Sequence, residues 1–114
     1  MCVVPYNKGI AFQILITETF GAWYKRVDKH TQRIIDARLT RIEQEGHFGT
    51  VNRFDGITEL KWKSGVRVYT AIVEPNVFVL LGGNKNGQEK DIRQAKKILK
   101  DVNAARSEAK LKKL

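Results

Sequence analysis

A group of charged side chains in the second half of the chain has the composition that phosphodiester chemistry needs. Glu59, Lys61 and Lys63 alternate along one predicted strand, Arg67 lies on the next, and Lys85 follows a later apolar strand. RNA cleavage without a metal needs a base for the 2′-hydroxyl, cations that neutralise the phosphate, and an acid for the leaving oxygen. One carboxylate among four cations offers these groups if the strands lie side by side.

Each of these residues also has a plainer structural interpretation. Alternating lysines such as Lys61 and Lys63 often solvate a strand face and prevent edge pairing. Glu59 taken alone is more typical of a cross-strand ion pair. Arg67 is harder to explain in this way, because it alternates with apolar residues such as Val68 on a half-buried strand.

Further residues are candidates for RNA contacts. Trp62 and Tyr69 could stack on bases, although aromatic residues on strands are more often part of the core, and for Trp62 we favour the core. The full set of candidate RNA contacts comprises Lys63, Tyr69, Asn84, Lys96 and Lys97.

The turn between the two charged strands leaves the face of Arg67 open. A two-residue turn at Ser64 and Gly65 places Arg67 opposite Trp62, on the other face from Glu59. A wider loop or a bulge brings Arg67 to the face of Glu59 instead.

The elements that must position these residues follow from the apolar patterns. We predict strands over 11–17, 57–63, 66–73 and 77–81, and a loop over 47–56. Thr17 is predicted to cap a first helix, Asp28 or Thr31 to begin a second that ends at Gly46, and Asn86 with Glu89 to begin a third.

This order indicates an α+β domain. We expect a small, mostly antiparallel sheet of about four strands, backed on one face by an N-terminal helical hairpin and a C-terminal helix. The single domain would span 1–114, with mobile tails over 1–10 and 107–114.

Composition limits the classes of partner. The chain has 114 residues, 42% of them apolar, and 21 Lys and Arg against 12 Asp and Glu, for a net charge of +9. The isoelectric point near 9.9 favours a polyanion such as nucleic acid, or an acidic protein. A merely basic surface explains the composition equally well.

The remaining composition argues against several kinds of site. Cys2 is the sole cysteine, which excludes an internal disulfide, and His30 and His47 are too few for a metal cluster. Polar residues interrupt the N-terminal apolar stretch, so we expect neither a signal peptide nor a membrane span. We therefore predict a cytoplasmic protein with no metal, no cofactor and no membrane partner.

The second half of the chain resembles the RelE/ParE superfamily of type II toxin–antitoxin toxins. The family pattern is E-L-[RK], a glycine turn, R-V-Y, L-L-x-G-G-[DN]-K and Q-x-K-D-I. It appears here in this order as Glu59–Lys61, Gly65, Arg67–Tyr69, Leu80–Lys85 and Gln88–Ile92. The likeness is strongest to the HigB-like branch, also called addiction module killer proteins.

The resemblance implies a RelE-like fold and cleavage of mRNA in the ribosomal A site. Carried over by motif, Arg67 is the phosphate and transition-state clamp, and Lys85 faces the phosphate or the leaving oxygen. The charged positions of the first motif fall on Glu59 and Lys61, and chemistry makes Glu59 the candidate general base. The implied partners are the ribosome, mRNA and a cognate helix-turn-helix antitoxin, which alone would contact DNA.

Two other functions stay open. The hairpin between Lys61 and Arg67 is shorter than in many relatives, and the C-terminal Tyr or His of some relatives has no counterpart. The superfamily also includes toxins that inhibit DNA gyrase through a protein interface without cleaving RNA. A general RNA-binding domain is a further, less specific alternative.

Overall fold

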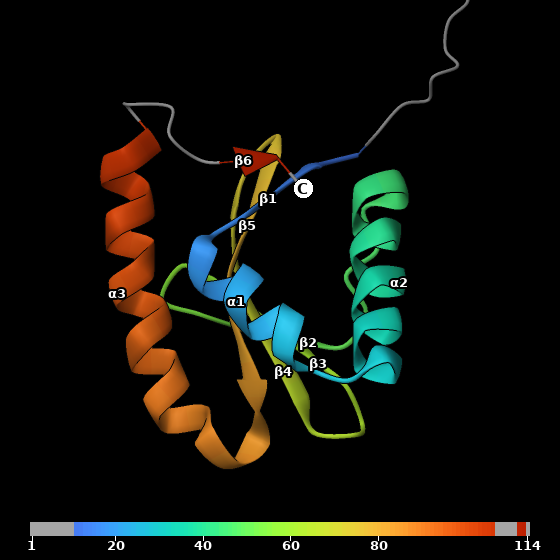
Figure 1. Ribbon diagram of the computed structural model, residues 1–114. Helices are drawn as coiled ribbons and strands as arrows, with labels where there is room; N and C mark the ends of the chain where they lie inside the picture. Colours follow the sequence, from blue (N-terminus) through green and yellow to red (C-terminus); the bar gives the residue numbers. More distant parts are fainter. Residues whose placement is uncertain (1–10, 107–111, 114) are drawn as a thin grey trace, which may run out of the picture.

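The computed structural model describes residues 11–106 and 112–113, which form one mixed sheet with helices on both of its faces (Figure 1). The strands are β1 (Gln13–Ile16), β2 (Val51–Phe54), β3 (Ile57–Lys61), β4 (Val66–Val73), β5 (Asn76–Asn84) and β6 (Lys112–Lys113). The helices are α1 (Glu18–Arg26), α2 (Lys29–Glu45) and α3 (Gln88–Arg106), and a 3-10 turn, η2 (Lys85–Gly87), precedes α3.

The described sheet has six strands in the order β2-β3-β4-β5-β1-β6, so the prediction of about four strands is wrong. The α+β class and the mostly antiparallel pairing are confirmed, and β1 runs parallel to β5. The predicted mobile tails lie outside the described residues, except for Lys112 and Lys113, which pair with β1.

One additional strand, β2, lies within the segment 47–56 that was predicted to be a loop. Its residues pair with β3 across a two-residue turn at Asp55 and Gly56. Both turn residues have positive φ, 50° and 79°, which is the conformation that Asp-Gly favours in tight hairpins. The hairpin therefore has a recognisable signal that the glycine-rich appearance of the segment obscured.

The predicted helix ends in the first half are confirmed. The backbone N–H of Phe20 donates to Thr17 Oγ1 at 3.1 Å, and the N–H of Thr31 donates to Asp28 Oδ1 at 2.8 Å. Each contact satisfies a backbone donor that the first helical turn leaves free. Gly46 ends α2 in the left-handed conformation with φ 74°.

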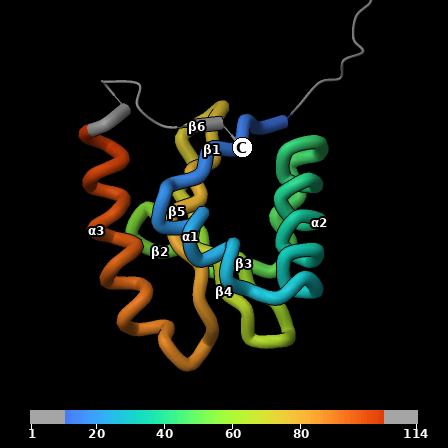
Figure 2. Tube along the Cα trace, in the orientation of Figure 1, coloured from blue at the N-terminus to red at the C-terminus, as the bar shows by residue number. Residues whose placement is uncertain are grey.

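The helices lie on both faces of the sheet, which corrects the prediction that all of them back one face. Figures 1 and 2 show the sheet between α3 on the left and α2 on the right. Leu60 and Val68 pack in the core under α1 and α2, whereas Ile57 and Phe78 pack in the core under α3. The central strands carry apolar side chains in both directions, so each face needs a helical cover.

The two N-terminal helices do not form the packed hairpin that was predicted. They are separated by Val27 and Asp28, and they diverge from this joint (Figure 1). Helix α1 packs mainly on β5, while α2 contacts β1. Each helix therefore packs against the sheet more than against the other helix.

The start of α3 also differs from the prediction. Strand β5 continues to Asn84, whose Oδ1 accepts a hydrogen bond from the N–H of Asn86 at 2.8 Å. Asn84 thus caps the 3-10 turn, and α3 begins at Gln88 rather than after a capping box at Asn86. Within the described residues, no helix combines the length and the apolar composition that a membrane crossing requires.

The packing of Trp23 on Gly82 generates a stability prediction. A Cβ at Gly82 would overlap ring atoms of Trp23, whereas a Cβ at Gly21 would meet only Ile16 Cδ1, at 3.9 Å. We expect Gly82→Ala to lower the free energy of unfolding by about 1–3 kcal/mol through overpacking. Gly21→Ala, the control, should leave it unchanged or raise it by up to about 1 kcal/mol through helix propensity. Chemical denaturation measures both, and equal stability of the two variants would contradict the packing.

Candidate functional site

The pairing of β3 with β4 brings three of the four predicted catalytic side chains, Glu59, Lys61 and Arg67, onto one face. Lys61 is opposite Arg67, and Glu59 is opposite Tyr69, so all four side chains lie on the face that α3 covers. The connection is the wider of the two alternatives, because residues 62–65 lie between the strands. Within it, the N–H of Gly65 donates to the carbonyl of Trp62 at 3.0 Å.

Glu59 is a fully buried carboxylate, with 0% of its surface exposed. Gln88 Nε2 donates to its Oε2 at 2.7 Å, and Arg67 Nε lies 3.5 Å from the same oxygen. Asn52 Nδ2 is 3.5 Å from Oε1, at the long limit of a hydrogen bond. A buried charge is tolerated only when such partners replace the water that it loses.

Arg67 is held by the loop that precedes it. Its Nη1 donates to the carbonyl of Trp62 at 3.0 Å and to that of Val66 at 2.9 Å. Only 12% of the side chain is exposed, and Nε faces Glu59 without the alignment of a hydrogen bond. Nη2 takes part in none of these contacts, so it is the nitrogen that remains for an anion.

Tyr69 completes the buried cluster. It is fully buried, so the expectation that its ring is exposed for stacking on bases is corrected. Its hydroxyl faces the Glu59 carboxylate but makes no hydrogen bond of full geometry within the described residues. Burial raises the pKa of Tyr69, and the charges of Glu59 and Asp91 raise it further, against the opposing effect of Arg67. Tyr69 therefore stays neutral next to the carboxylate.

Lys85 lies at the surface beside this cluster. Its backbone N–H donates to the carbonyl of Gly65 at 2.8 Å, and its aliphatic chain lies against Gly65. The same loop holds Arg67, so Lys85 and Arg67 share one support. The ammonium group is exposed, and the structure brings it near the β3–β4 loop rather than into contact with Glu59.

The predicted RNA contacts are dispersed. Lys63 and Asn84 are exposed near the β3–β4 loop. Lys96 Nζ pairs with Asp55 Oδ2 at 2.8 Å, so its charge is partly engaged in joining α3 to the β2–β3 turn. Lys97 lines an open hollow on the outer face of α3 with Lys90, Arg93 and Gln94.

Three residues near the site were missed as candidates. Gln88 and Asp91 both face the sheet from the first turn of α3, where Asp91 packs on Gly83 and burial raises its pKa against the effect of Lys90. Their spacing of three residues, which puts them on one helix face, was the available signal. Arg38 donates to the carbonyl of Lys61 at 2.9 Å and lies 4.1 Å from the Trp62 ring centre, a contact between distant segments that no pattern predicts.

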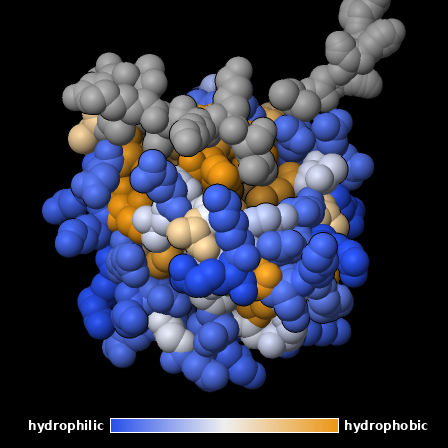
Figure 3. Space-filling model, viewed as in Figure 1, coloured by the Kyte–Doolittle hydropathy of each residue, from blue (hydrophilic) through white to orange (hydrophobic). Residues whose placement is uncertain are grey.

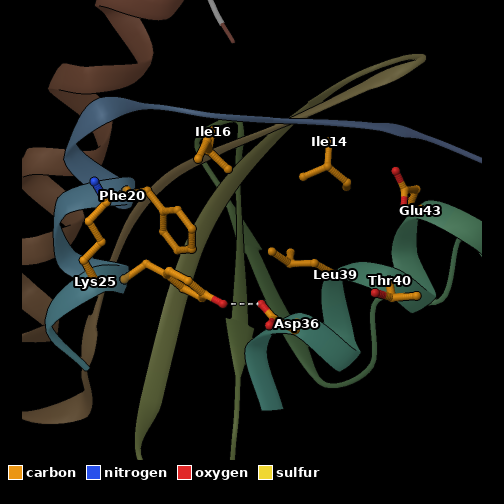
Figure 4. A pocket seen from close by; sticks show the side chains of 10 residues that line it. Ile14, Ile16, Phe20, Lys25, Asp36, Leu39, Thr40 and Glu43 are labelled. Atoms are coloured by element: carbon orange, nitrogen blue, oxygen red, sulfur yellow. Dashed lines mark hydrogen bonds between the residues drawn. The ribbon is translucent and has the colours of Figure 1, made fainter. Parts of the chain in front are cut away.

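A second hollow lies on the opposite face of the sheet, between β1, α1 and α2. It has a volume of about 490 Å³, and Ile14, Phe20 and Leu39 point into it from these three elements (Figure 4). Asp36 lies at its rim and accepts a hydrogen bond from the Tyr24 hydroxyl at 2.7 Å. Figure 3 shows apolar surface among the hydrophilic side chains on the side of the molecule that faces the viewer in Figure 1. Such a floor does not suit a phosphate backbone, so we assign no nucleic-acid contact to this groove.

The described residues contain no cluster of three or more His, Cys, Asp or Glu side chains suited to a metal ion. The Glu59 cluster itself brings together one carboxylate, one guanidinium, one phenol and two carboxamides, those of Gln88 and Asn52, with lysines at the rim. These groups can transfer a proton and stabilise an anion.

Comparison with known proteins gives a relative and two structures of the same fold. No protein-family model matches the chain. An uncharacterized protein of Haemophilus influenzae is 34% identical over 98 residues, which cover 82% of this chain and 98% of that protein.

Two toxin–antitoxin complexes contain similar structures. The match to the RelBE complex of E. coli has a TM-score of 0.56 and 14% identity, and it covers 65% of this chain and 96% of the other. For the RelB–RelE complex of Methanococcus jannaschii, the TM-score is 0.58, the identity 8%, and the coverage 67% and 95%. At such identity the likeness shows a common fold alone, so the fold is RelE-like, and by sequence the chain belongs to the same family as the Haemophilus influenzae protein.

Proposed function

We propose that this chain is the toxin of a type II toxin–antitoxin system and that it cleaves mRNA on the ribosome without a metal ion. The observation that carries the proposal is the buried Glu59–Arg67 pair on the α3 face of a RelE-like sheet. Apolar residues at such positions are often at least as stabilising as an ion pair. A buried carboxylate held against a guanidinium is therefore better explained by a role in function than by stability alone.

In the proposed reaction, Glu59 accepts the proton of a ribose 2′-hydroxyl. The 2′-oxygen then attacks the adjacent phosphorus, and the bond to the 5′-oxygen breaks. The products are a 2′,3′-cyclic phosphate and a 5′-hydroxyl, whose proton comes from Lys85. Arg67 Nη2 and Lys61 neutralise the negative charge that grows on the phosphate oxygens, which is the largest contribution such a site can make.

The ribosome contributes what the isolated site lacks. Glu59 is fully buried and Gln88 occupies one of its oxygens, so RNA must reach the carboxylate beside the first turn of α3. Positioning of reactants is worth several orders of magnitude in rate. A message fixed in the A site supplies that positioning, and the net charge of +9 favours association with ribosomal RNA.

The complete burial of Glu59 also favours a second candidate function. A carboxylate without exposed surface suits a protein that acts through its surface rather than through this cluster, such as a toxin that inhibits DNA gyrase. Purified protein in a DNA supercoiling assay separates the two candidates, because only the second inhibits gyrase.

The partners follow from the same proposal. The similar structures come from complexes of a toxin with its antitoxin. We propose a cognate antitoxin for this chain, a small helix-turn-helix protein that supplies the contact with DNA. The motifs around Lys85 and Gln88 support the HigB-like branch, and a target on the ribosome implies the cytoplasm.

The base is tested by Glu59→Gln, which removes the charge and keeps the shape. We expect single-turnover cleavage of ribosome-bound message to fall at least about 100-fold, as for loss of a general base. The melting temperature should fall, because the variant leaves the largely buried Arg67 guanidinium without its counter-ion, but the two carbonyl contacts of Arg67 should keep the protein folded. Glu74→Gln, an exposed carboxylate at the β4–β5 turn, is the control and should cleave normally. A folded Glu59→Gln variant with wild-type rate would refute the assignment.

Lys85 is tested against Lys97, an exposed lysine on the outer face of α3. Lys85→Ala should slow single-turnover cleavage by about 10-fold or more, because a cation aimed at the phosphate is lost. It should leave the melting temperature nearly unchanged, since exposed lysines contribute little to stability. Lys97→Ala should weaken ribosome binding in a salt-dependent manner and spare the rate of bound message. Equal rate losses in both variants would mean that Lys85 belongs to the general basic field.

A further inference from the structure

The hydrogen bond between Gln88 and Glu59 joins the start of α3 to strand β3. The proposed reaction needs groups from both elements at fixed relative positions. Gln88 is the first residue of α3, and Glu59 lies in the middle of β3. Their 2.7 Å hydrogen bond is shorter than the 3.5 Å approaches of Arg67 Nε and Asn52 Nδ2 to the same carboxylate. The main tether of Glu59 is therefore a neutral side chain.

The chemistry of the two groups determines which atom of Gln88 faces Glu59. An ionised carboxylate can only accept hydrogen bonds, so the amide nitrogen has to be the donor. A neutral donor orients the carboxylate without placing a second cation against it. A second cation would favour the ionised form more strongly and make the carboxylate a weaker base.

Gln88 is also joined to Lys85 by a short, well-held segment. The two residues are separated only by the rest of the 3-10 turn η2. That turn is fixed at its start by the Lys85 N–H bond to Gly65 and by the Asn84 side chain, which accepts from Asn86. A displacement of Gln88 would therefore also displace the 3-10 turn that contains Lys85.

We propose that Gln88 is a positioning residue for cleavage: its side-chain amide holds the Glu59 carboxylate and ties it to the turn that carries Lys85. The inference rests on the proposed function, because it assigns Gln88 a role toward the proposed base. It differs from a merely structural role, in which Gln88 would pin α3 to the sheet without affecting how Glu59 binds protons. Apolar residues such as Ala95 and Val102 already anchor α3 to the sheet.

The test follows the protonation of Glu59 directly. The carboxyl carbon of Glu59 is titrated by ¹³C NMR in the isolated protein, and single-turnover cleavage of ribosome-bound message is measured across the same pH range. The variants are Gln88→Glu, which sets two carboxylates against each other, and Gln88→Met, which removes the donor at similar size. Gln94→Glu adds the same charge on the exposed face of α3 and is the control.

The expected shift has a definite sign. Two carboxylates in contact cannot both ionise freely, so Gln88→Glu should raise the titration midpoint of Glu59 by about one pH unit or more. Gln88→Met should raise it less. Because the base acts when deprotonated, the acid limb of the rate profile should move to higher pH by the same amount. The other charged or titratable groups around Glu59, which are Lys61, Arg67, Tyr69 and Asp91, are the same in every variant.

Three results would overturn the proposals, and they are distinguishable. An unshifted midpoint in both Gln88 variants would mean that Gln88 does not hold Glu59. A shifted midpoint with an unshifted rate profile would mean that the carboxylate held by Gln88 is not the base. Wild-type protein that leaves ribosome-bound message intact would overturn the proposed function itself, whatever the titration shows.

Discussion

The burial of the Glu59 carboxylate is the constraint on which the rest of the site depends. A charge without exposed surface requires hydrogen-bond donors and a counter-ion, and here they come from three different segments. Gln88 reaches it from α3, Arg67 from β4, and Asn52 from β2. Contacts with the carboxylate thus link three separate elements of the fold. The loss of any one partner would leave part of the cost of desolvating the carboxylate uncompensated.

The sheet provides the frame for this convergence. Strands β3, β4 and β5 carry apolar side chains on both faces, so α1 and α2 must cover one face and α3 the other. That three-layer arrangement puts the charged cluster beneath the start of α3 instead of on an open sheet surface. The consequence for function is that access to Glu59 is controlled by the first turn of one helix, whose position is set by the 3-10 turn that carries Lys85.

Short-range sequence signals allowed part of the fold and part of the candidate site to be predicted. The caps at Thr17 and Asp28 and the end of α2 at Gly46 follow from short-range hydrogen bonding, and they are confirmed. The class of fold and the grouping of Glu59, Lys61 and Arg67 followed from strand alternation, but their common face depended on how many residues the β3–β4 loop contains. Strand β2 was missed although Asp55-Gly56 is a strong hairpin signal, because the flanking residues are polar and glycine-rich.

Other features depended on contacts that sequence patterns do not encode. Nothing in the spacing of Gln88 and Glu59, 29 residues apart, indicates that they meet. The pairing of Lys96 with Asp55 likewise arises only when α3 lies across the β2–β3 turn. Tyr69 shows the limit of interpreting residue types: a Tyr on a strand can stack on bases or fill the core, and here its position under α3 buries it completely.

The central claim is that this chain cuts message by attack of the 2′-hydroxyl when the ribosome positions the RNA. It is tested most directly by incubating the purified protein with programmed ribosomes, and separately with the same RNA free in solution, and then determining the chemistry of the RNA ends. The account predicts cleavage at the A site of the ribosome-bound message, with 2′,3′-cyclic phosphate and 5′-hydroxyl ends, and little cleavage of free RNA. Intact message on the ribosome, or ends that carry a 5′-phosphate, would contradict it.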